Sequence, residues 1–332
     1  MNPKVSILVP IYNVSNYIER CAKSLFNQTF QDIEFIFVDD ATPDDSIEKL
    51  IKIIEQYPNR KEQVKIIYHP LNKGLATTRN TAINVSTGKY ILVVDSDDYI
   101  EPNMIQLLYE KAIIDNADIV VSDFYFEYSN KTIYCSDYLS LNENNHLKDL
   151  IGFNNSQAPL WNKLVNSDLY KKKECRVPDG LNYYEDRYTV LRLYYFANKI
   201  VKINQAFYHY NKYNDNAITN KIVKMHFENV LRFWNLFDDF LRKYNEFEKY
   251  EKIMYLPKAQ SKARLMVDTN SKELRKEFAN IFQFEEKQCF SSFRLGEKIM
   301  LLLIRFKFFN LAQLYHIISI FKNKFVQSFQ TH

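Results

Sequence analysis

Two groups of acidic residues stand directly after strand-like runs in this 332-residue chain, where their carboxylates can do chemistry. Asp39 and Asp40 follow the strand-like run 33–38, and the sequence Asp-Ser-Asp-Asp of residues 95–98 follows the apolar run 90–94. Because the carboxyl ends of parallel strands meet at one crevice, we expect these acids to lie close together. A divalent cation would relieve their repulsion, and Mg²⁺ or Mn²⁺ is usually held by one or two carboxylates with phosphate oxygens and water. The pattern predicts a metal-dependent diphosphate site.

Helix caps and solvated turn residues are the alternative for acids in such positions, and we favour that alternative for Asp44 and Asp45. Other phosphate-binding classes are excluded, because the chain contains neither GxxxxGK[ST] nor GxGxxG. A haloacid-dehalogenase-like phosphatase has its Asp-x-Asp near the N-terminus. It also needs Thr or Val at the fourth position after the first Asp, where this chain has Tyr99.

The elements that must position these acids alternate between strand and helix over the first 125 residues or so. Apolar runs predict strands at 5–9, 33–38, 64–68, 90–94 and 119–122. Helices are expected over 15–27, from Thr42 with Pro43 at the first helical position, from the turn at 72–74 to about Val85, and from Pro102. Repeated β-α-β units predict an α/β protein with a mostly parallel, doubly wound sheet covered by helices.

The pattern changes in the second part of the chain. Strand-like aromatic pieces occur at 123–128 and 206–210, and a helix is predicted over 223–247. We place a domain boundary near residue 220. The expected domains are 1–220, with halves 1–125 and 126–220, and a mostly helical C-terminal extension, 221–332.

Composition and charge narrow the function further. The four cysteines have no close pair, so neither a zinc knuckle nor a redox CxxC motif is predicted. Residues 291–332 carry six Lys or Arg and one acid, whereas the net charge of the whole chain is +4, so nucleic-acid binding is not expected. The longest apolar run, 299–304, is far short of the ~20 residues of a membrane span. We find no signal-peptide pattern and expect a cytoplasmic protein.

Four sequence blocks resemble family 2 glycosyltransferases, which have the Rossmann-like GT-A fold. They are VSILVPIYN at 5–13, FVDD at 37–40, NKGLATTRN at 72–80 and GKYILVVDSDD at 88–98. Weaker similarity to bacterial enzymes of capsule, O-antigen or exopolysaccharide synthesis continues at 160–163, 180–186, 208–210 and 216–219. The resemblance implies an inverting enzyme that uses Mn²⁺ or Mg²⁺. It would move a sugar from a nucleoside diphosphate to a glycan or lipid-linked acceptor, and UDP is the expected nucleotide.

The resemblance also implies roles for residues around the nucleotide. Asp40 would accept the N3–H of uracil, Asp39 would help to shape that pocket, and Tyr12 would pack beside the base. Arg79 would reach the nucleotide or its diphosphate, and Lys73 would add positive charge. The implied nucleotide-binding set is Pro10, Tyr12, Asp39, Asp40, Lys73, Arg79, Asp95, Ser96 and Asp97.

The implied metal site rests on the Asp-x-Asp motif, with Asp97 as the direct ligand and Asp95 directed toward the ribose and the metal shell. His209 would complete the shell as a neutral imidazole; a packed, hydrogen-bonded histidine is the alternative. One departure from the family is Ala41 in the segment Ala-Thr-Pro, where the family often has Gly-Ser-Thr, which leaves the course of this loop open.

Sugar transfer also needs a general base for the acceptor hydroxyl. Glu185 and Asp186 resemble the Glu-Asp base motif of the family, and we assign the base to Asp186. Glu185 would orient it or bind an acceptor hydroxyl; a solvated acid pair at a helix N-terminus is the alternative. The segment Trp161, Asn162 and Lys163 is a candidate acceptor platform, because aromatic rings stack on sugars, with Trp161 as a core residue the alternative.

Two other functions remain as alternatives. A sugar-phosphate nucleotidyltransferase would need a Gly-rich loop near the N-terminus, and residues 9–12 do not form one. A degenerate transferase could serve as a glycan-binding or scaffold subunit, against which the presence of Asp95, Asp97 and Asp186 argues. The tail, 293–325, is predicted to be a basic amphipathic segment that lies on an anionic membrane surface at its inner face. Packing on the catalytic domain, or on a second subunit in a homodimer, is the alternative for the tail.

Overall fold

The computed structural model describes residues 3–152, 158–173, 175–214 and 222–317. The chain divides into two compact units, Met1–Asn216 and Ala217–His332. The sequence predicts this division near residue 220. The predicted similarity at 216–219 lies outside the described residues, as does the end of the predicted tail beyond residue 317.

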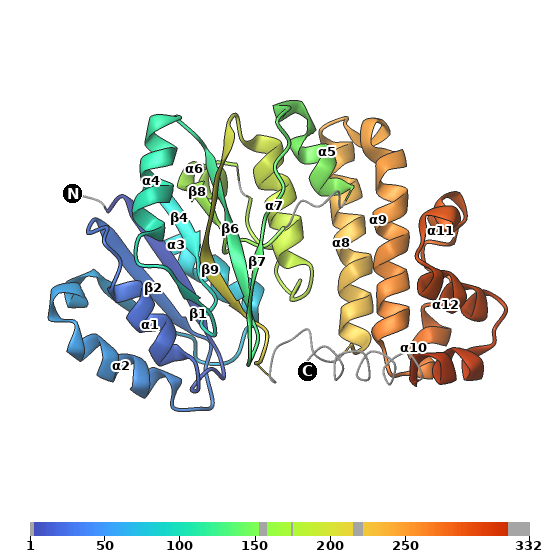
Figure 1. The fold of residues 1–332 in the computed structure, drawn as a ribbon, viewed down its shortest axis with the longest axis horizontal. Helices are drawn as coiled ribbons and strands as arrows, with labels where there is room; N and C mark the ends of the chain where they lie inside the picture. Colours follow the sequence, from blue (N-terminus) through green and yellow to red (C-terminus); the bar gives the residue numbers. More distant parts are fainter. Residues whose placement is uncertain (1–2, 153–157, 174, 215–221, 318–332) are drawn as a thin grey trace. The chain divides into compact units, whose positions relative to one another are not determined.

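The first unit is built on a nine-stranded sheet with the order β3-β2-β1-β4-β8-β6-β9-β5, and β7 pairs with β6 (Figure 1). The strands are β1 (Val5–Ile11), β2 (Ile33–Asp39), β3 (Val64–Tyr68), β4 (Tyr90–Val93), β5 (Tyr99–Ile100), β6 (Ile119–Glu127), β7 (Thr132–Cys135), β8 (Lys163–Asn166) and β9 (Ile200–Asn211). Every residue of β1, β2 and β4 is buried, which is why these strands appear in the sequence as mainly apolar runs, interrupted in β1 by Ser6 and in β2 by Glu34.

The half of the sheet formed by β3, β2, β1 and β4 is parallel, as predicted. The chain runs outward from β1 to β3 and then returns to place β4 on the other side of β1. Beyond the carboxyl ends of β1 and β4, the strand order reverses, which is the place where open α/β sheets bind ligands. The acidic motif 95–98 follows β4 at this position.

The other half of the sheet is mixed. β8 runs antiparallel between β4 and β6, and β5 and β7 are antiparallel to β9 and β6. The predicted strands 119–122 and 123–128 form one strand, β6, whose register with β9 shifts around Asp123. The α/β class is confirmed, although the sheet is parallel only in part.

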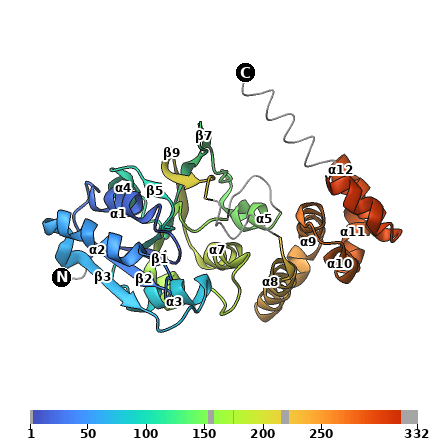
Figure 2. The ribbon, with the colours of Figure 1, turned by 90° about the horizontal axis from the view of Figure 1, so that it is seen from below.

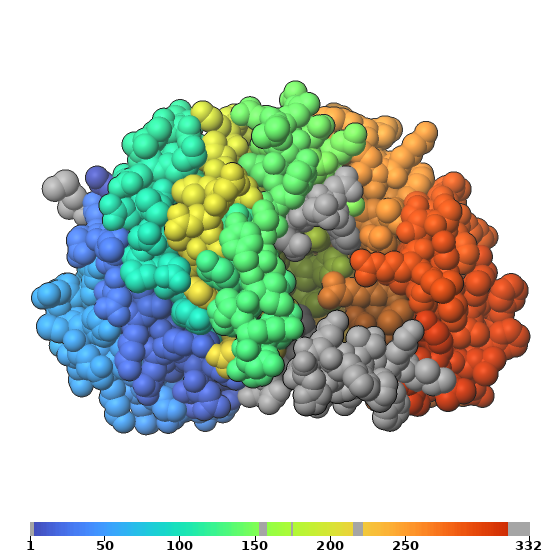
Figure 3. Space-filling view, in the orientation of Figure 1, coloured from blue at the N-terminus to red at the C-terminus, as the bar shows by residue number. Residues whose placement is uncertain are grey.

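Helices cover both faces of the sheet (Figure 2). In the first unit they are α1 (Ile18–Phe26), α2 (Ser46–Gln56), α3 (Leu75–Val85), α4 (Met104–Ile114), α5 (His146–Ile151), α6 (Ser167–Lys171) and α7 (Glu185–Phe196). The helices α1, α2 and α4 bury their apolar sides in the core formed by one face of β1, β2 and β4. On the opposite side, α3 contacts β1 and β2. The hairpin of β6 and β7 stands at the surface (Figure 3), where Tyr134 is half exposed.

The start of α2 differs from the prediction. The helix begins at Ser46 rather than after Thr42, because the Asp44 carboxylate organises a loop instead. It accepts hydrogen bonds from the Thr42 hydroxyl at 2.7 Å, the Ser46 hydroxyl at 2.6 Å and the Ser15 N–H at 2.8 Å. Asp44 thus fixes the loop after β2 to the segment before α1.

The second unit is helical, as predicted. It consists of α8 (Lys224–Lys243), α9 (Phe247–Asp268), α10 (Lys272–Glu277), α11 (Gln283–Cys289) and α12 (Leu295–Arg305), and residues 309–317 are also helical. Glu286, on α11, is buried and pairs with Lys262 at 2.7 Å and with Arg305 at 2.5 Å, which fixes α9, α11 and α12 together. None of the helices in the described parts of the chain has both the length and the apolarity needed to cross a membrane.

Candidate active site

The acidic motif after β4 is held by contacts to its backbone and side chains. The Asp97 carboxylate accepts a hydrogen bond from the Asn214 amide at 2.7 Å, and the Asp97 carbonyl accepts one from Arg20 at 3.2 Å. Burial, together with the charge of Asp95, raises the pKa of Asp97. The thiol of Cys21, on α1, is buried next to this loop, 3.9 Å from the Asp95 carbonyl oxygen.

Asp98, the third acid of this motif, has a structural role. It is fully buried, and its carboxylate accepts hydrogen bonds from the Tyr208 hydroxyl and the Asn211 N–H, both at 2.7 Å. Burial, followed by the charges of Asp97 and Asp95, places its pKa well above the usual range. Asp98 therefore anchors the motif to β9. Ser96 is also buried in this loop.

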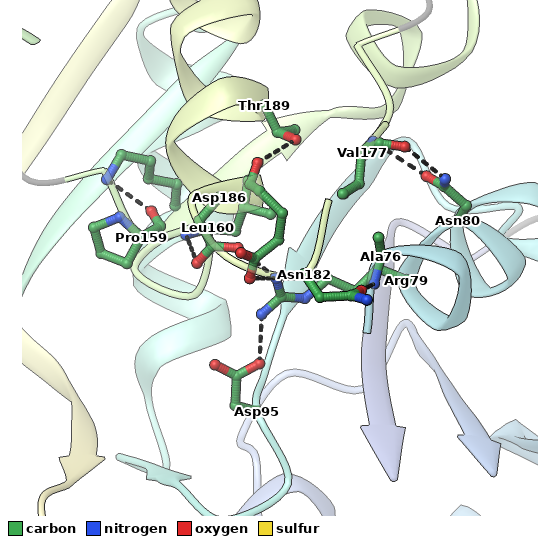
Figure 4. A network of polar contacts seen from close by, with 12 residues as sticks. Ala76, Arg79, Asn80, Asp95, Pro159, Leu160, Val177, Asn182, Asp186 and Thr189 are labelled. Atoms are coloured by element: carbon green, nitrogen blue, oxygen red, sulfur yellow. Dashed lines mark hydrogen bonds and ion pairs between the residues drawn. The ribbon is translucent and has the colours of Figure 1, made fainter. Parts of the chain in front are cut away.

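A single arginine joins three acids from distant segments (Figure 4). Arg79, on α3, donates from Nη2 to Asp95 Oδ1 at 2.8 Å and from Nη1 to Glu185 Oε1 at 2.9 Å. Its Nη1 also pairs with Asp186 Oδ1. The side chain of Arg79 is only 2% exposed, so this guanidinium is taken up by carboxylates of the chain itself. The sequence assigned Arg79 to the nucleotide, and this assignment stays a prediction.

The two acids of the predicted base motif, Glu185 and Asp186, occupy the first two positions of α7. Burial and the neighbouring Asp186 charge raise the pKa of Glu185 to about 7. The pKa of Asp186 is also raised, by burial, against the opposing charge of Arg79. The residue before them, Tyr184, has φ of 68°, an uncommon conformation for a bulky side chain. Asp186 is the more exposed of the two acids, at 22% against 12%, which suits it to meet an acceptor.

Asp40 lies at the centre of a second network. Its Oδ1 contacts His69 Nδ1 at 2.7 Å and the Lys73 N–H at 2.8 Å, and its Oδ2 accepts the Gly74 N–H at 2.8 Å. Burial opposes ionisation, but the hydrogen bonds from His69, Lys73 and Gly74 outweigh it and lower the pKa of Asp40. Sequence reasoning missed His69, although it directly follows β3 at the same edge of the sheet as the acids.

The remaining predicted nucleotide contacts lie around this network. Asp39 accepts the Thr42 N–H at 2.8 Å. Tyr12 is 48% exposed, which leaves its ring available to a ligand, and Pro10 is buried in β1. The side chain of Lys73 is at the surface. The structure thus places these residues at the ends of β1 and β2 and in the loop that opens α3.

His209 makes its side-chain contacts to two glutamates outside the acidic motif, and its metal role stays a prediction. Its two ring nitrogens contact Glu127 at 2.7 Å and Glu101 at 2.9 Å. The ring also stacks between Tyr99, at 4.2 Å, and Tyr125, at 4.7 Å. These contacts agree with the alternative interpretation of a packed, hydrogen-bonded histidine.

The predicted acceptor platform is wrong, because its three residues are buried. Trp161 stacks on Tyr208 at 4.3 Å as part of the core. Lys163 is 1% exposed, and its ammonium lies 3.2 Å from Asp137 and 2.7 Å from the Asn162 side-chain oxygen. These residues support the sheet and are not available to a sugar.

No group of three His, Cys, Asp or Glu side chains is arranged to hold a metal ion among the residues that the structure describes. Asp95 and Asp97 nevertheless fit a cation that is shared with a ligand. Each raises the energy of the other's charge, and a divalent ion commonly takes one or two carboxylates and completes its shell with phosphate oxygens and water.

Comparison with known proteins identifies the family. Residues 6–173 match the family model "Glycosyl transferase family 2". The uncharacterised glycosyltransferase EpsJ of Bacillus subtilis is 33% identical over 231 residues, 66% of this chain and 64% of EpsJ. Glycosyltransferase GlyG of Streptococcus pneumoniae is 33% identical over 224 residues, 64% of this chain and 72% of GlyG. The chain belongs to glycosyl transferase family 2.

Solved structures agree with this fold. S. aureus TarS 1–349, in complex with UDP, superposes with a TM-score of 0.67 at 19% identity, covering 94% of this chain and 90% of that one. A mannosyltransferase from Pyrobaculum calidifontis, in complex with GDP-Man and Mn²⁺, gives a TM-score of 0.50 at 14% identity, covering 97% of this chain and 87% of that one. The GT-A fold that the sequence predicted is confirmed.

Proposed function

We propose that the protein is an inverting glycosyltransferase that moves a hexosyl or N-acetylhexosaminyl group from a UDP-sugar to a glycan or lipid-linked acceptor in bacterial surface polysaccharide synthesis. One observation carries this proposal: Asp95, of the acidic motif, and Asp186, of the base motif, meet on one guanidinium at the edge of a family 2 fold. Crystal structures of TarS with UDP and with UDP-GlcNAc support a uridine donor for this fold.

The donor's uridine would lie at the ends of β1 and β2. Tyr12 offers an exposed ring beside the base, and Asp39 and Asp40 offer carboxylate oxygens to the N3–H of uracil. Asp40 also holds the Lys73 and Gly74 N–H groups, so it shapes the loop that covers the pocket. Pro10 lines the nucleotide with its backbone, and Ser96 belongs to the loop that carries the metal ligands.

Mn²⁺ or Mg²⁺ would be held by Asp97 and Asp95. When bound, such an ion neutralises the charge of the departing diphosphate. The mannosyltransferase structure with Mn²⁺ supports a divalent ion for this fold. Asp97 keeps its carboxylate directed by the Asn214 amide, and the Asp98 anchor holds the backbone of the motif in place.

Asp186 would act as the general base. As the acceptor oxygen forms its bond to the anomeric carbon, the hydroxyl proton passes to the Asp186 carboxylate. The bond from that carbon to the diphosphate oxygen breaks, and its electron pair leaves with UDP, so the configuration is inverted. Burial raises the pKa of Asp186, which makes the carboxylate a better proton acceptor than an exposed aspartate.

The tail would bring this enzyme to lipid-linked acceptors at the inner face of the membrane. Its described part exposes a stripe of large apolar side chains: Phe306 at 63% and Phe308 at 55% lie in the turn after α12, and Leu311 at 53%, Leu314 at 52% and Ile317 at 41% lie on the helical residues 309–317. From residue 298 to the end, the sequence contains five Lys or Arg and no acid. Anionic lipid matches both features. A homodimer through this stripe would bring two basic segments together, so it is the second choice.

Turnover of UDP-sugars tests the function. Purified full-length protein with Mn²⁺ and a panel of UDP-sugars should release UDP, and the transferred sugar should have the inverted anomeric configuration by NMR. A protein that binds UDP but releases none in the presence of polysaccharide or lipid-linked acceptors would be the degenerate, glycan-binding transferase. Release of UDP-sugar from UTP and a sugar phosphate would instead identify a nucleotidyltransferase.

A further inference from the structure

Arg79 is the point at which the two halves of the proposed active site are connected. Both of its terminal nitrogens are used, Nη2 by Asp95 and Nη1 by Glu185 and Asp186. Asp95 belongs to the donor and metal side, whereas Asp186 belongs to the acceptor side. The guanidinium is buried, and its contacts to the three carboxylates are made through the two terminal nitrogens alone.

The helix that carries Arg79 also holds the segment before the base. Asn80 exchanges two hydrogen bonds with the backbone of Val177, at 2.8 and 3.2 Å, and the Ala76 N–H donates to the Asn182 side chain at 3.3 Å (Figure 4). These contacts fix α3 to the chain that leads into α7. Arg79 thus extends from a rigid helix whose distance to the base segment is already set.

We propose that Arg79 is a positioning residue that sets the Asp186 base relative to Asp95, and through Asp95 relative to the donor. This inference rests on the proposed function. Burial of the side chain, which is 2% exposed, leaves little room for a direct contact between Arg79 and the diphosphate, and three of its five N–H donors already face carboxylates of the chain. Arginine suits the task because its planar fork presents several donors in fixed directions, whereas lysine is a point charge.

A positioning role and a phosphate-binding role differ in which kinetic constant they affect. Misplacement of a base by about 1 Å costs roughly 10²-fold in rate and leaves ground-state binding of the donor in place. Loss of a phosphate contact would instead weaken UDP binding and leave uridine binding unchanged. The comparison of UDP and uridine affinities therefore separates the two roles without any need for turnover.

The test uses Arg79→Lys in the full-length chain, with Arg60→Lys as the matched control. Arg60 is also buried, at 5% exposure, but its guanidinium donates to the backbone carbonyls of Phe26, Gln28 and Phe30. We expect Arg79→Lys to lower kcat by ~10²-fold and to change the Kd values of UDP and uridine by less than about threefold. Arg60→Lys should leave kcat within about twofold.

A double-mutant cycle shows whether Arg79 acts through the base. In the Asp186→Asn background, Arg79→Lys should lower kcat by less than about threefold, because the residue that it positions has been removed. The inference is overturned if the loss of kcat is the same in both backgrounds, or if UDP affinity falls tenfold while uridine affinity does not. If Arg79→Lys does not fold, Arg79→Gln with Glu185→Gln removes one charge of each sign and allows the same comparison. A wild-type protein that transfers no sugar disproves the proposed function, whereas the affinities still test the phosphate contact.

Discussion

The backbone N–H of Gly74 donates to the Asp40 carboxylate at 2.8 Å, which ties the loop that opens α3 to the end of β2. Gly74 has φ of 84°, and a Cβ atom at this position would lie 2.9 Å from the side chain of Asn182. The same glycine therefore allows two close approaches, one to the donor pocket and one to the segment before the base.

Gly74→Ala is expected to lower the free energy of unfolding by ~1–2 kcal/mol, because alanine disfavours a positive φ. It should also weaken uridine binding, because a shift of this backbone would move the N–H of residue 74 away from Asp40. Urea denaturation and calorimetry measure the two effects. Gly152→Ala is the control, since Gly152 has φ of −73°, which alanine adopts readily. Unchanged uridine affinity in a folded Gly74→Ala protein would separate this loop from the donor pocket.

Asp186→Asn should lower kcat by ~10²-fold or more while the Kd of UDP changes little, because the substitution removes the proton acceptor and no ground-state contact to the donor. Glu185→Gln is the matched variant, because glutamine has the size of the Glu185 side chain and the proposed base, Asp186, is unchanged. A near-normal rate in Asp186→Asn, with a large loss in Glu185→Gln, would move the base to Glu185.

The lowered pKa of Glu34 predicts how the free energy of unfolding depends on pH. Burial opposes its charge, but hydrogen bonds from Lys65, Ser6 and Thr87 outweigh burial, so its pKa in the folded protein is lowered. A lowered pKa stabilises the fold above the ordinary pKa of glutamate, and this contribution is lost as the pH falls through the folded value. Glu34→Gln should therefore cost ~1–3 kcal/mol at pH 7 and less at pH 3.5, which is below the ordinary pKa of glutamate of about 4.3.

Urea denaturation at the two pH values measures this difference. Glu62→Gln is the control, because Glu62 is exposed and the substitution should change the free energy of unfolding little at either pH. An equal cost of Glu34→Gln at pH 7 and pH 3.5 would show that the hydrogen bonds do not depend on the charge of Glu34.

The exposed apolar stripe of the tail predicts binding to anionic vesicles. Leu311→Ser with Leu314→Ser should reduce cosedimentation with anionic vesicles severalfold at low salt, because both leucines would enter the headgroup boundary. Ile114→Ser with Leu141→Ser is the control, since these apolar residues are also exposed but lie in the first unit. If the wild type ignores anionic vesicles and sediments as a dimer that the tail substitutions dissociate, the stripe is a subunit interface.

Local sequence predicted the parallel half of the sheet well, because the strands buried on both faces, β1, β2 and β4, appear as mainly apolar runs, and acids follow β2 and β4. It failed where side chains choose distant partners. Asp44 accepts bonds from Ser15 as well as Ser46, which moves the start of α2 beyond Thr42. Ala41 adopts φ of 55°, so the backbone keeps a conformation typical of glycine although the glycine is absent.

The candidate site was predictable in its acids but not in their connections. Asp95 and Asp186 could be named from motifs, whereas their common partner Arg79 lies on a third segment and shows its role only in the folded chain. The contacts of His209 could not be predicted for the same reason, because its partners Glu101 and Glu127 are far from it in sequence. Residue type and strand ends locate the crevice, and long-range packing decides which groups face into it.

The buried thiol of Cys21 lies next to the Asp95 carbonyl oxygen, so its reactivity reports on movements of the acidic motif. Thiol reagents attack the thiolate, and burial, reinforced by Asp98 and Asp97, raises the pKa of Cys21 well above its usual value. The reagent can therefore react only while a local opening exposes this thiol, and movement of the 95–98 loop away from α1 is one such opening. The rate of labelling at this one cysteine gives the frequency of such openings, and a ligand that braces the loop should slow it in proportion to occupancy.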